Sequence, residues 1–293
     1  MITISQLYLE TRQLLLAQED MQTAGFIARN LICNATGKTK EQMLADYNCT
    51  VTDAQFQQVE EFINRILSGE PLAYVLGEWE FRGLKLKVNP DVLIPRDDTC
   101  AVTELALKYA GYINKPLRIL DLCTGSGCIG LAVAKEISNT SVILADISNR
   151  ALSVAKENAV ANDLVDRVSC VTANALDMPD ETLGKFDMIV SNPPYITAAE
   201  MMELPLSVQS FEPHIALYGG VDGLDFYQTI SDKYRNALKP KGYLCFEFGM
   251  GQGDAVCQIL QKYGYTILER TKDFNQIERA VIAQWQEEDN YGY

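Results

Sequence analysis

One short turn in the chain carries groups that could hold a planar nitrogen during alkyl transfer. The tetrapeptide Asn192–Tyr195 (NPPY) directly follows Phe186–Ser191, an apolar run with the pattern of a buried strand. Two consecutive prolines cannot continue a strand ladder, and a residue before proline is biased to extended backbone. The turn would therefore point the Asn192 carboxamide and the Pro193 carbonyl into the crevice at the carboxyl edge of a sheet.

The two oxygens of this turn predict a specific chemistry. An amide or aromatic amine is a poor nucleophile because its lone pair is delocalised. Two acceptors, on Asn192 and Pro193, could take both N–H bonds, orient the lone pair and favour the positive charge that grows on nitrogen. Tyr195 would pack flat against the planar group. No histidine base is required, which agrees with a chain whose one histidine is His214.

A glycine-rich loop is the second chemical feature. The segment Asp121–Gly130 reads DLCTGSGCIG, and its glycines at 125, 127 and 130 fit the G-x-G-x-x-G pattern. Asp146 ends the next strand-like run, about 20 residues further on, where a carboxylate can accept hydrogen bonds from ribose hydroxyls. Together these residues indicate a nucleoside-containing cofactor, and they leave a dinucleotide and S-adenosylmethionine both open.

Charge favours S-adenosylmethionine over a dinucleotide. A carboxylate at Asp121, just before the glycines, would repel a pyrophosphate and suit a cationic amine and a sulfonium. The whole chain has 25 basic and 39 acidic side chains, a formal charge of −14. This excess repels phosphate backbones, and neither residues 1–90 nor 91–293 has the basic balance of a nucleic-acid-binding surface. No nucleic-acid partner is expected.

These groups need a scaffold of strands and helices to position them. From residue 97 onward, short apolar runs alternate with stretches of helical periodicity. The expected strands are 118–122, 142–146, 168–172, 186–191, 243–248, 265–268 and 279–285, and the expected helices include 128–137, 149–161, 226–238 and 252–263. This alternation predicts an α/β fold with a doubly wound, mainly parallel sheet.

The first part of the chain has a different pattern. Helical periodicity runs from Ile4 to about Leu67, and Glu80–Val88 alternates apolar and polar residues around a glycine, which is typical of a hairpin. We therefore expect a small helical N-terminal domain (1–75), a β-hairpin linker (76–96) and a cofactor-binding domain (97–293).

Other features of the sequence narrow its setting. The start has neither the basic nor the apolar region of a secretory signal, and no apolar run has the length of a membrane span. The eight cysteines are scattered, so we expect reduced thiols in a cytoplasmic protein with no membrane partner. Cys123 and Cys128 have no histidine or second cysteine pair nearby and are expected to be packing residues, so no metal is predicted. His214 is expected in a loop.

The motifs together resemble a known family. The glycine loop, Asp146 and NPPY are similar to class I S-adenosylmethionine-dependent methyltransferases that modify a planar nitrogen, although NPPY alone is shared with DNA adenine methyltransferases. Further segments narrow the resemblance to the release factor glutamine methyltransferases (the HemK family) over nearly the whole chain. They are Pro71–Gly77, Glu80-Phe81, Val92–Arg96, Glu212-Pro213 and Gly219–Asp225.

The resemblance implies a seven-stranded Rossmann-like fold and a defined activity. The methyl group of S-adenosylmethionine would pass to the side-chain amide nitrogen of the glutamine in the Gly-Gly-Gln loop of bacterial class I peptide chain release factors, which act in translation termination, leaving S-adenosylhomocysteine. Asn192 and Pro193 would hold the amide, Pro194 would shape the turn, and Tyr195 would pack on the amide. The implied cofactor contacts are Asp121, Cys123, Thr124, Gly125, Ser126, Gly127, Asp146, Asn174, Ala175 and Asn192. The N-terminal helices would help to dock the release factor.

The chain departs from the family pattern at two places. The family commonly has glycine where Cys123 stands and Pro-Glu where Asp97-Asp98 stand. A small side chain at Cys123, beside the methionine end of the cofactor, is expected to be tolerated. Asp97-Asp98 would keep an acidic residue near the cofactor mouth, so we expect activity to survive.

Four alternatives stay open. Glutamine methylation of a ribosomal protein uses the same tetrapeptide, but the N-terminal region and flanking motifs favour release factors. Adenine methylation of DNA or RNA would need a basic groove or an added recognition domain. An NAD-dependent oxidoreductase would leave NPPY without a role. A non-catalytic S-adenosylmethionine binder would keep cofactor binding after Asn192→Ala, with no methyl transfer to lose.

Overall fold

A computed structural model describes residues 2–113 and 115–286. Contacts divide the chain into two compact units. The first unit contains the chain up to Glu78 together with Leu206–Phe211, and the second contains Trp79–Pro205 and the chain from Glu212. Each unit has its own buried core, so each is described by itself.

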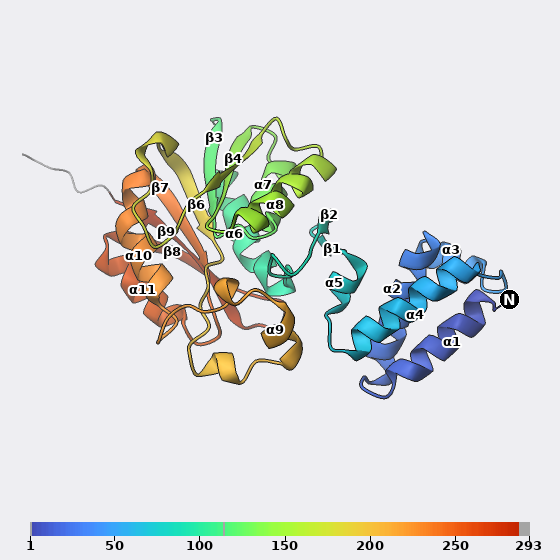
Figure 1. The fold of residues 1–293 in the computed structure, drawn as a ribbon. Helices are drawn as coiled ribbons and strands as arrows, with labels where there is room; N and C mark the ends of the chain where they lie inside the picture. The colour runs from blue at the N-terminus through green and yellow to red at the C-terminus, as the bar shows by residue number, and fades with distance from the viewer. Residues whose placement is uncertain (1, 114, 287–293) are drawn as a thin grey trace, which may run out of the picture. The chain divides into compact units, whose positions relative to one another are not determined.

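The first unit is helical, as its periodicity predicts (Figure 1). Its helices are α1 (Ile4–Leu15), α2 (Met21–Thr36), α3 (Lys40–Ala45), α4 (Asp53–Leu67), α5 (Leu72–Leu76) and α9 (Leu206–Phe211). Threonine caps begin α1, α3 and α4, and in each a glutamine three residues later bonds back to the cap, forming a capping box. Buried leucine, isoleucine and valine side chains from α1, α2 and α4 form the core. None of the helices described is both long and apolar enough to cross a membrane.

The second unit begins with the predicted hairpin, β1 (Glu78–Phe81, its first residue grouped with the helical unit) and β2 (Leu84–Lys87). Arg82 and Gly83 form its turn with φ angles of 48° and 71°, as a two-residue hairpin loop that matches strand twist requires. Leu84 and Leu86 are fully buried and join the core of the large sheet. The hairpin is therefore packed into the second unit rather than suspended as a free linker.

The rest of the second unit is a seven-stranded sheet of order β5-β4-β3-β6-β7-β9-β8. Its strands are β3 (Leu117–Leu122), β4 (Thr140–Asp146), β5 (Val168–Thr172), β6 (Phe186–Ser191), β7 (Leu238–Glu247), β8 (Tyr265–Lys272) and β9 (Glu278–Trp285). The first five in this order pair in parallel, and β9 is antiparallel to both of its neighbours. The predicted doubly wound, mainly parallel fold is confirmed.

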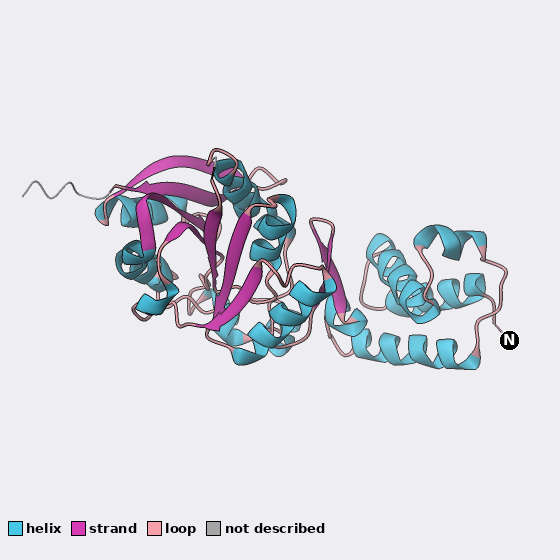
Figure 2. Ribbon diagram, turned by 90° about the horizontal axis from the view of Figure 1, so that it is seen from above, coloured by secondary structure: helices cyan, strands magenta, loops and turns pink. Residues whose placement is uncertain are grey.

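Helices cover both faces of this sheet (Figure 2). α6 (Cys100–Ala110), α7 (Cys128–Glu136) and α8 (Asn149–Ala161) pack with the hairpin on one face, whereas α10 (Asp225–Lys233) and α11 (Gly253–Lys262) pack on the other. From β3 the chain continues through β4 to β5 on one side of the sheet, and it then crosses to β6, which pairs with β3 on the other side. The direction in which strands are added therefore reverses between β3 and β6. Such a switch point opens a crevice at the carboxyl ends of the strands.

The sequence prediction is wrong in detail at one connection. β7 begins at Leu238 rather than at residue 243, and the expected helix 226–238 ends at Lys233 and continues as a 3-10 turn. Pro240 interrupts the apolar pattern there, and a register shift between the pairings of Phe186 and Met188 accommodates the irregular start of the strand. The prediction also lacks α6, the helix after the hairpin.

Candidate functional site

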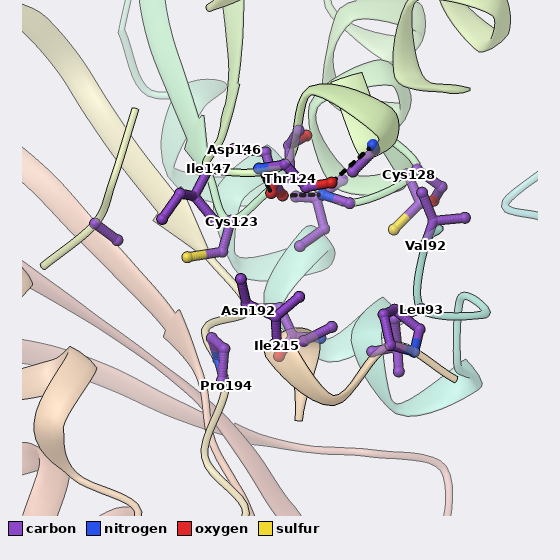
Figure 3. A pocket seen from close by; sticks show the side chains of 18 of the residues that line it. Val92, Leu93, Cys123, Thr124, Cys128, Asp146, Ile147, Asn192, Pro194 and Ile215 are labelled. Carbon is purple, nitrogen blue, oxygen red and sulfur yellow. Dashed lines mark hydrogen bonds between the residues drawn. The ribbon is translucent and has the colours of Figure 1, made fainter. Parts of the chain in front are cut away.

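A cavity of about 230 Å³ opens in the second unit at the carboxyl ends of β3, β4, β5 and β6. Figure 3 shows side chains that line it. Its main segments are 123–126 after β3, 146–148 at β4, 173–176 after β5, Asn192 and Pro194 after β6, 91–96 after the hairpin, and the residues Pro213, Ile215 and Ala216. We call it the closed cavity because it is the more enclosed of the two cavities described here. It occupies the switch-point crevice, where ligands bind in this class of sheet.

The glycine loop forms one wall of the closed cavity. Cys123, Gly125 and Gly127 have φ angles of 60°, 53° and 84°, so the backbone curls through the left-handed region three times before α7 begins. Glycine adopts this conformation freely and cysteine does so at a cost, which explains why glycine is the expected residue at position 123. Thr124 and Ser126, two of the predicted cofactor contacts, also line the cavity, whereas Gly127 is not among the lining residues.

Asp121 lies beneath the loop instead of in the cavity. Its side chain is fully buried, and Oδ2 accepts hydrogen bonds from Thr124 Oγ1 at 2.6 Å and from Gly130 N at 2.9 Å. A Cβ at Gly130 would stand 2.4 Å from Leu144, so only glycine lets α7 come this close. Burial raises the pKa of Asp121 to about 7. The expected direct contact with a cationic amine has no counterpart in the cavity lining, and the residue braces the loop.

Asp146 lines the closed cavity at the tip of β4. Its Oδ2 accepts from Gly125 N and its Oδ1 from Ser148 N, both at 2.9 Å. Each carboxylate oxygen has a second lone pair, so the side chain keeps acceptor capacity for ligand hydroxyls. Burial raises the pKa of Asp146, and the bonds from Ser148 and Gly125 act against that rise. The position fits the predicted ribose contact.

Asn174 and Ala175, the third predicted cofactor segment, also line the closed cavity. The Asn174 side chain is occupied locally, because Nδ2 donates to Asp177 at 2.9 Å and Oδ1 accepts from Leu176 N at 3.1 Å. Its backbone oxygen accepts from Tyr234 at 3.2 Å. The segment therefore offers a fixed wall of the cavity.

The tetrapeptide Asn192–Tyr195 stands between the closed cavity and a second one. Asn192 and Pro194 line the closed cavity, whereas Tyr195 lines a more open cavity of about 550 Å³ and Pro193 is among the lining residues of neither. We call the second one the open cavity. Its lining residues are Arg96, Asp97, Asp98, Tyr195, Ile196, Glu200, Gly249, Met250, Gln252, Asn275 and Arg279.

Asp97 and Asp98 thus face the open cavity and are not among the residues that line the closed one. Asp98 pairs with Arg279 at 2.9 Å, so part of its charge is balanced. Arg96 lines both cavities and pairs with the buried carboxylate of Glu212. Any effect of Asp97 and Asp98 is therefore expected on a molecule that binds in the open cavity.

Glycines of the segment 219–223 hold the turn from behind, a role that the sequence analysis does not assign. A Cβ at Gly219 would lie 2.5 Å from Tyr195 Cα and 2.6 Å from Pro194 O, and one at Gly223 would lie 2.3 Å from Tyr195 O. Gly219 N also donates to Ile196 O at 2.9 Å. The glycine segment that carries part of the family resemblance thus lets its backbone pack directly against the backbone of the turn.

Two polar side chains complete the surroundings of the turn. Asn192 Nδ2 donates to Thr99 Oγ1 at 3.4 Å, and the Tyr195 hydroxyl lies 3.5 Å from Glu247 Oε1. Glu247 ends β7 and is 1% exposed, and burial raises its pKa to about 7. Neither Thr99 nor Glu247 is among the residues predicted from the sequence, although an acid inside the apolar run Tyr243–Phe248 is a usable signal.

One amide joins the glycine loop to the hairpin. Asn158, fully buried on α8, accepts from Lys87 N at 2.6 Å and donates to Lys87 O at 3.0 Å and to Ser126 O at 2.9 Å. Three hydrogen bonds satisfy a buried carboxamide almost completely. The loop and the hairpin are therefore held at a fixed spacing within the second unit.

The two cysteines and the histidine for which no metal-binding or catalytic role is predicted lie in or beside the closed cavity. Cys123 and Cys128 both line the closed cavity, and burial raises the pKa of each thiol, so neither is a thiolate near neutral pH. His214 begins a short 3-10 helix, His214–Ala216, and its two neighbours Ile215 and Ala216 line the closed cavity.

Known proteins with similar sequences identify the family. The chain matches the model of the PrmC N-terminal domain over residues 7–77 and that of the methyltransferase small domain over residues 106–205. The release factor glutamine methyltransferase of Clostridium acetobutylicum is 39% identical over 233 residues, which are 80% of this chain and 81% of that protein. The chain belongs to the release factor glutamine methyltransferase family. The sequence resemblance, and with it the prediction of a methyltransferase, is confirmed.

Members and relatives of this family differ in length. The bifunctional methyltransferase of Rickettsia typhi is 35% identical over 271 residues, which are 87% of this chain and 52% of that protein, so the chain spans about half of it. Among solved structures, a methyltransferase from Pyrococcus furiosus matches with a TM-score of 0.51 at 17% identity, over 76% of this chain and 98% of that one. That identity supports the shared fold alone.

Proposed function

We propose that the chain transfers the methyl group of S-adenosylmethionine to the side-chain amide nitrogen of the glutamine in the Gly-Gly-Gln motif of bacterial class I peptide chain release factors. The position of the turn between two cavities carries this proposal: Asn192 and Pro194 wall the closed cavity, and Tyr195 walls the open one. A methyl donor on one side and a protein side chain entering from the other would meet at the turn. The names of the relatives support the choice of substrate.

The closed cavity fits S-adenosylmethionine better than a dinucleotide. Among the described lining residues, Arg96 is the basic one, and Glu212 already pairs with it. A pyrophosphate would meet the carboxylates of Asp91 and Asp146 with little compensation, whereas a sulfonium and an ammonium gain from them. Asp146 retains acceptor capacity for ribose hydroxyls. When bound, S-adenosylmethionine supplies a methyl group on a positively charged sulfur.

The residues of the turn would orient the glutamine amide. Asn192 Nδ2 is engaged by Thr99, which leaves Oδ1 as the acceptor for one substrate N–H, and the Pro193 carbonyl would take the other. Both acceptors favour the positive charge that develops on nitrogen. Tyr195 would pack against the amide plane, and the open cavity gives the departing proton access to solvent. Holding the nucleophile in line supplies much of the remaining rate.

We also propose that the helical unit docks the release factor. Leu9, Leu14 and Met21 are exposed by 53%, 53% and 67%, so apolar side chains of this unit are accessible to a protein partner. Leu9→Ser/Leu14→Ser should raise the KM for release factor and leave kcat and the Kd for S-adenosylmethionine unchanged. An unchanged KM would exclude both leucines from the docking site.

Labelled methyl transfer tests the proposed function directly. Purified release factor, the same factor with its Gly-Gly-Gln glutamine changed to alanine, and adenine-containing DNA would each be incubated with the chain and labelled S-adenosylmethionine. Label on the intact factor alone is the expected result. Label on DNA, on a ribosomal protein added as a further substrate, or on no substrate while the cofactor still binds would overturn the substrate assignment.

A further inference from the structure

A buried carboxyl lies directly behind both functional side chains of the turn. Glu247 is 1% exposed, and its Oε1 lies 3.5 Å from the Tyr195 hydroxyl. The Thr99 hydroxyl also lies beside the carboxyl and lowers its pKa against the effect of burial, and no hydrogen bond of standard geometry joins the two groups. The other oxygen, Oε2, has no partner of standard geometry among the described residues, so the group can accept more than it now does.

A structural ion pair does not account for this carboxyl. The cation that faces it is Arg279, which already pairs with Asp98 and Asp273 at 2.9 Å each. A glutamate buried at the end of a strand without its own cation costs stability. Such a cost usually persists where the group serves the site that it faces.

The direction of the hydrogen bonds gives Glu247 a specific effect on Asn192. A threonine hydroxyl has one hydrogen to donate, and a carboxylate can only accept. Thr99 Oγ1 accepts from Asn192 Nδ2 at 3.4 Å, so its own hydrogen is free to point toward the neighbouring Glu247 carboxylate. Donation through Nδ2 fixes which end of the Asn192 amide remains for the substrate: the oxygen.

The opposite arrangement would disable the turn. If the Thr99 hydrogen pointed at Asn192, the amide would flip and offer its NH2 group to a substrate nitrogen that itself carries hydrogens. Two donors would then face each other, and the acceptor needed by the developing charge would be lost. The contacts are long in the free protein, as the 3.4 Å and 3.5 Å distances show, and such bonds commonly tighten only in the reacting complex.

We propose that Glu247 is a positioning residue for methyl transfer, which acts through Thr99 to keep the Asn192 oxygen toward the substrate and acts directly on the Tyr195 hydroxyl. This inference rests on the proposed function of the turn. Glu247 touches neither substrate nor cofactor in this role. It fixes the direction of the hydrogen bonds made by Asn192 and Tyr195, which do contact the substrate.

The protonation state of Glu247 should therefore control the rate. The groups that face it are Asp98 and Thr99 from the segment before α6, Tyr195 after β6, Arg279 on β9, Tyr227 on α10 and Cys128 on α7. Burial raises the pKa of Glu247 to about 7, with Asp98 adding to the rise and Thr99, Arg279 and Tyr195 opposing it. Once protonated, the carboxyl can donate to Thr99, and the direction of the relay is no longer fixed.

Variants at Thr99 test the relay without touching the carboxyl. Thr99→Val keeps the shape and removes the hydroxyl. We expect kcat to fall on the order of tenfold to a hundredfold, because a misoriented acceptor loses the benefit of positioning. Thr99 also lines the closed cavity, so the Kd for S-adenosylmethionine is measured beside kcat and should change by less. Thr99→Ser should restore most of the rate. In an Asn192→Ala background, Thr99→Val should cost nothing further. A Thr99→Val enzyme with the wild-type kcat, or the same loss in both backgrounds, would overturn the relay.

Glu247→Gln should lower kcat by a similar factor and flatten the rise of kcat between pH 6 and 8 that the relay predicts for the wild type, on the basis of a carboxyl that titrates near pH 7. Asp187→Asn is the matched control, because Asp187 is also buried, on β6, but at the far end from the turn and paired with Lys115 and Lys239. It should keep the wild-type profile. A pH profile for Glu247→Gln that matches the wild type would refute the proposal.

A magnetic resonance measurement separates this proposal from the proposed function. The Asn192 side-chain NH2 signals, identified by their absence in Asn192→Ala, should move with pH near 7 in the wild-type chain and stay fixed in Thr99→Val and Glu247→Gln. This readout requires no substrate. Signals that do not respond to pH in the wild type would refute the relay, whereas absence of methyl transfer to release factor with a responsive signal would refute the substrate assignment alone.

Discussion

Gly219→Ala should impair methyl transfer although residue 219 is not among the residues that line either cavity. The alanine Cβ would stand 2.5 Å from Tyr195 Cα and 2.6 Å from Pro194 O, where ordinary contacts begin at 3.4 Å. Backbone atoms rather than flexible side-chain ends occupy both positions, so the turn must shift by about 0.9 Å, the difference between 3.4 and 2.5 Å, to admit the methyl group. A displacement of about 1 Å at reacting groups can cost on the order of 100-fold in rate.

The assay is steady-state methyl transfer to release factor, with the Kd for S-adenosylmethionine measured by calorimetry and the melting temperature by circular dichroism. We expect kcat to fall about 100-fold while the cofactor Kd stays within a factor of about three, because the displaced groups orient the substrate. Gly111→Ala is the matched control: its Cβ would meet nothing nearer than 3.4 Å, and it lies at the end of α6.

Three results would refute this reasoning. Wild-type kcat and KM in Gly219→Ala would mean that the turn absorbs the methyl group without moving its functional atoms. An equal loss in Gly111→Ala would mean that the assay reports general destabilisation. A kcat loss that disappears when the assay temperature is lowered well below the melting temperature would point to unfolding as well.

Four further outcomes follow from the site. Asn192→Ala should reduce methyl transfer ~100- to 1,000-fold with near-normal cofactor affinity, measured by labelled transfer and calorimetry, since one electrostatic contact to the transition state is lost. Asp146→Ala should weaken S-adenosylmethionine binding roughly 10- to 100-fold by calorimetry, because a hydrogen bond to a charged group contributes about 1.5–3 kcal/mol. Cys123→Gly should keep the rate within a few-fold, since position 123 has a φ of 60° that glycine adopts freely. The pKa of Glu247 rises from 4.5 to about 7 on folding, so the folded chain holds a proton that the unfolded chain has released, and the free energy of unfolding falls as the pH rises from about 4.5 to about 7. Urea unfolding at pH 5 and pH 8 should show that the wild type loses up to about 3 kcal/mol of this free energy relative to Glu247→Gln.

Periodicity predicts the scaffold well, because burial imposes it on the sequence. The strands β3, β4 and β6 are mainly apolar because both faces of a central parallel strand are covered, and they lie where their runs predict, as does the edge strand β5. The start of β7 could not be predicted because of Pro240. A proline that is tolerated at an irregular strand pairing cannot be distinguished in the sequence from a proline that ends a strand. Apolar pattern records what is buried but not how a strand begins.

Side-chain direction at the site is less accessible to sequence reasoning. A carboxylate at the end of a strand can face a ligand or turn inward, and nothing in the letters shows that Thr124 and Gly130 both donate to Asp121. Asp146 stands at the equivalent place on the next strand and does face the cavity. Glu247 is separated from Asn192 by 55 positions in the sequence, and only the pairing of β6 with β7 brings the two strand ends together.

The three hydrogen bonds of Asn158 have a practical consequence for anyone who wishes to produce the cofactor-binding part alone. A fragment that begins at residue 97, where the α/β pattern starts, would leave Asn158 without two of its three partners and would uncover the apolar surface that Leu84 and Leu86 now fill. The remaining bond, to Ser126, joins α8 to the glycine loop and would be kept. A fragment that begins at Trp79 retains all of these contacts. A fragment of the cofactor-binding part should therefore include the hairpin, and its first codon should lie before the hairpin.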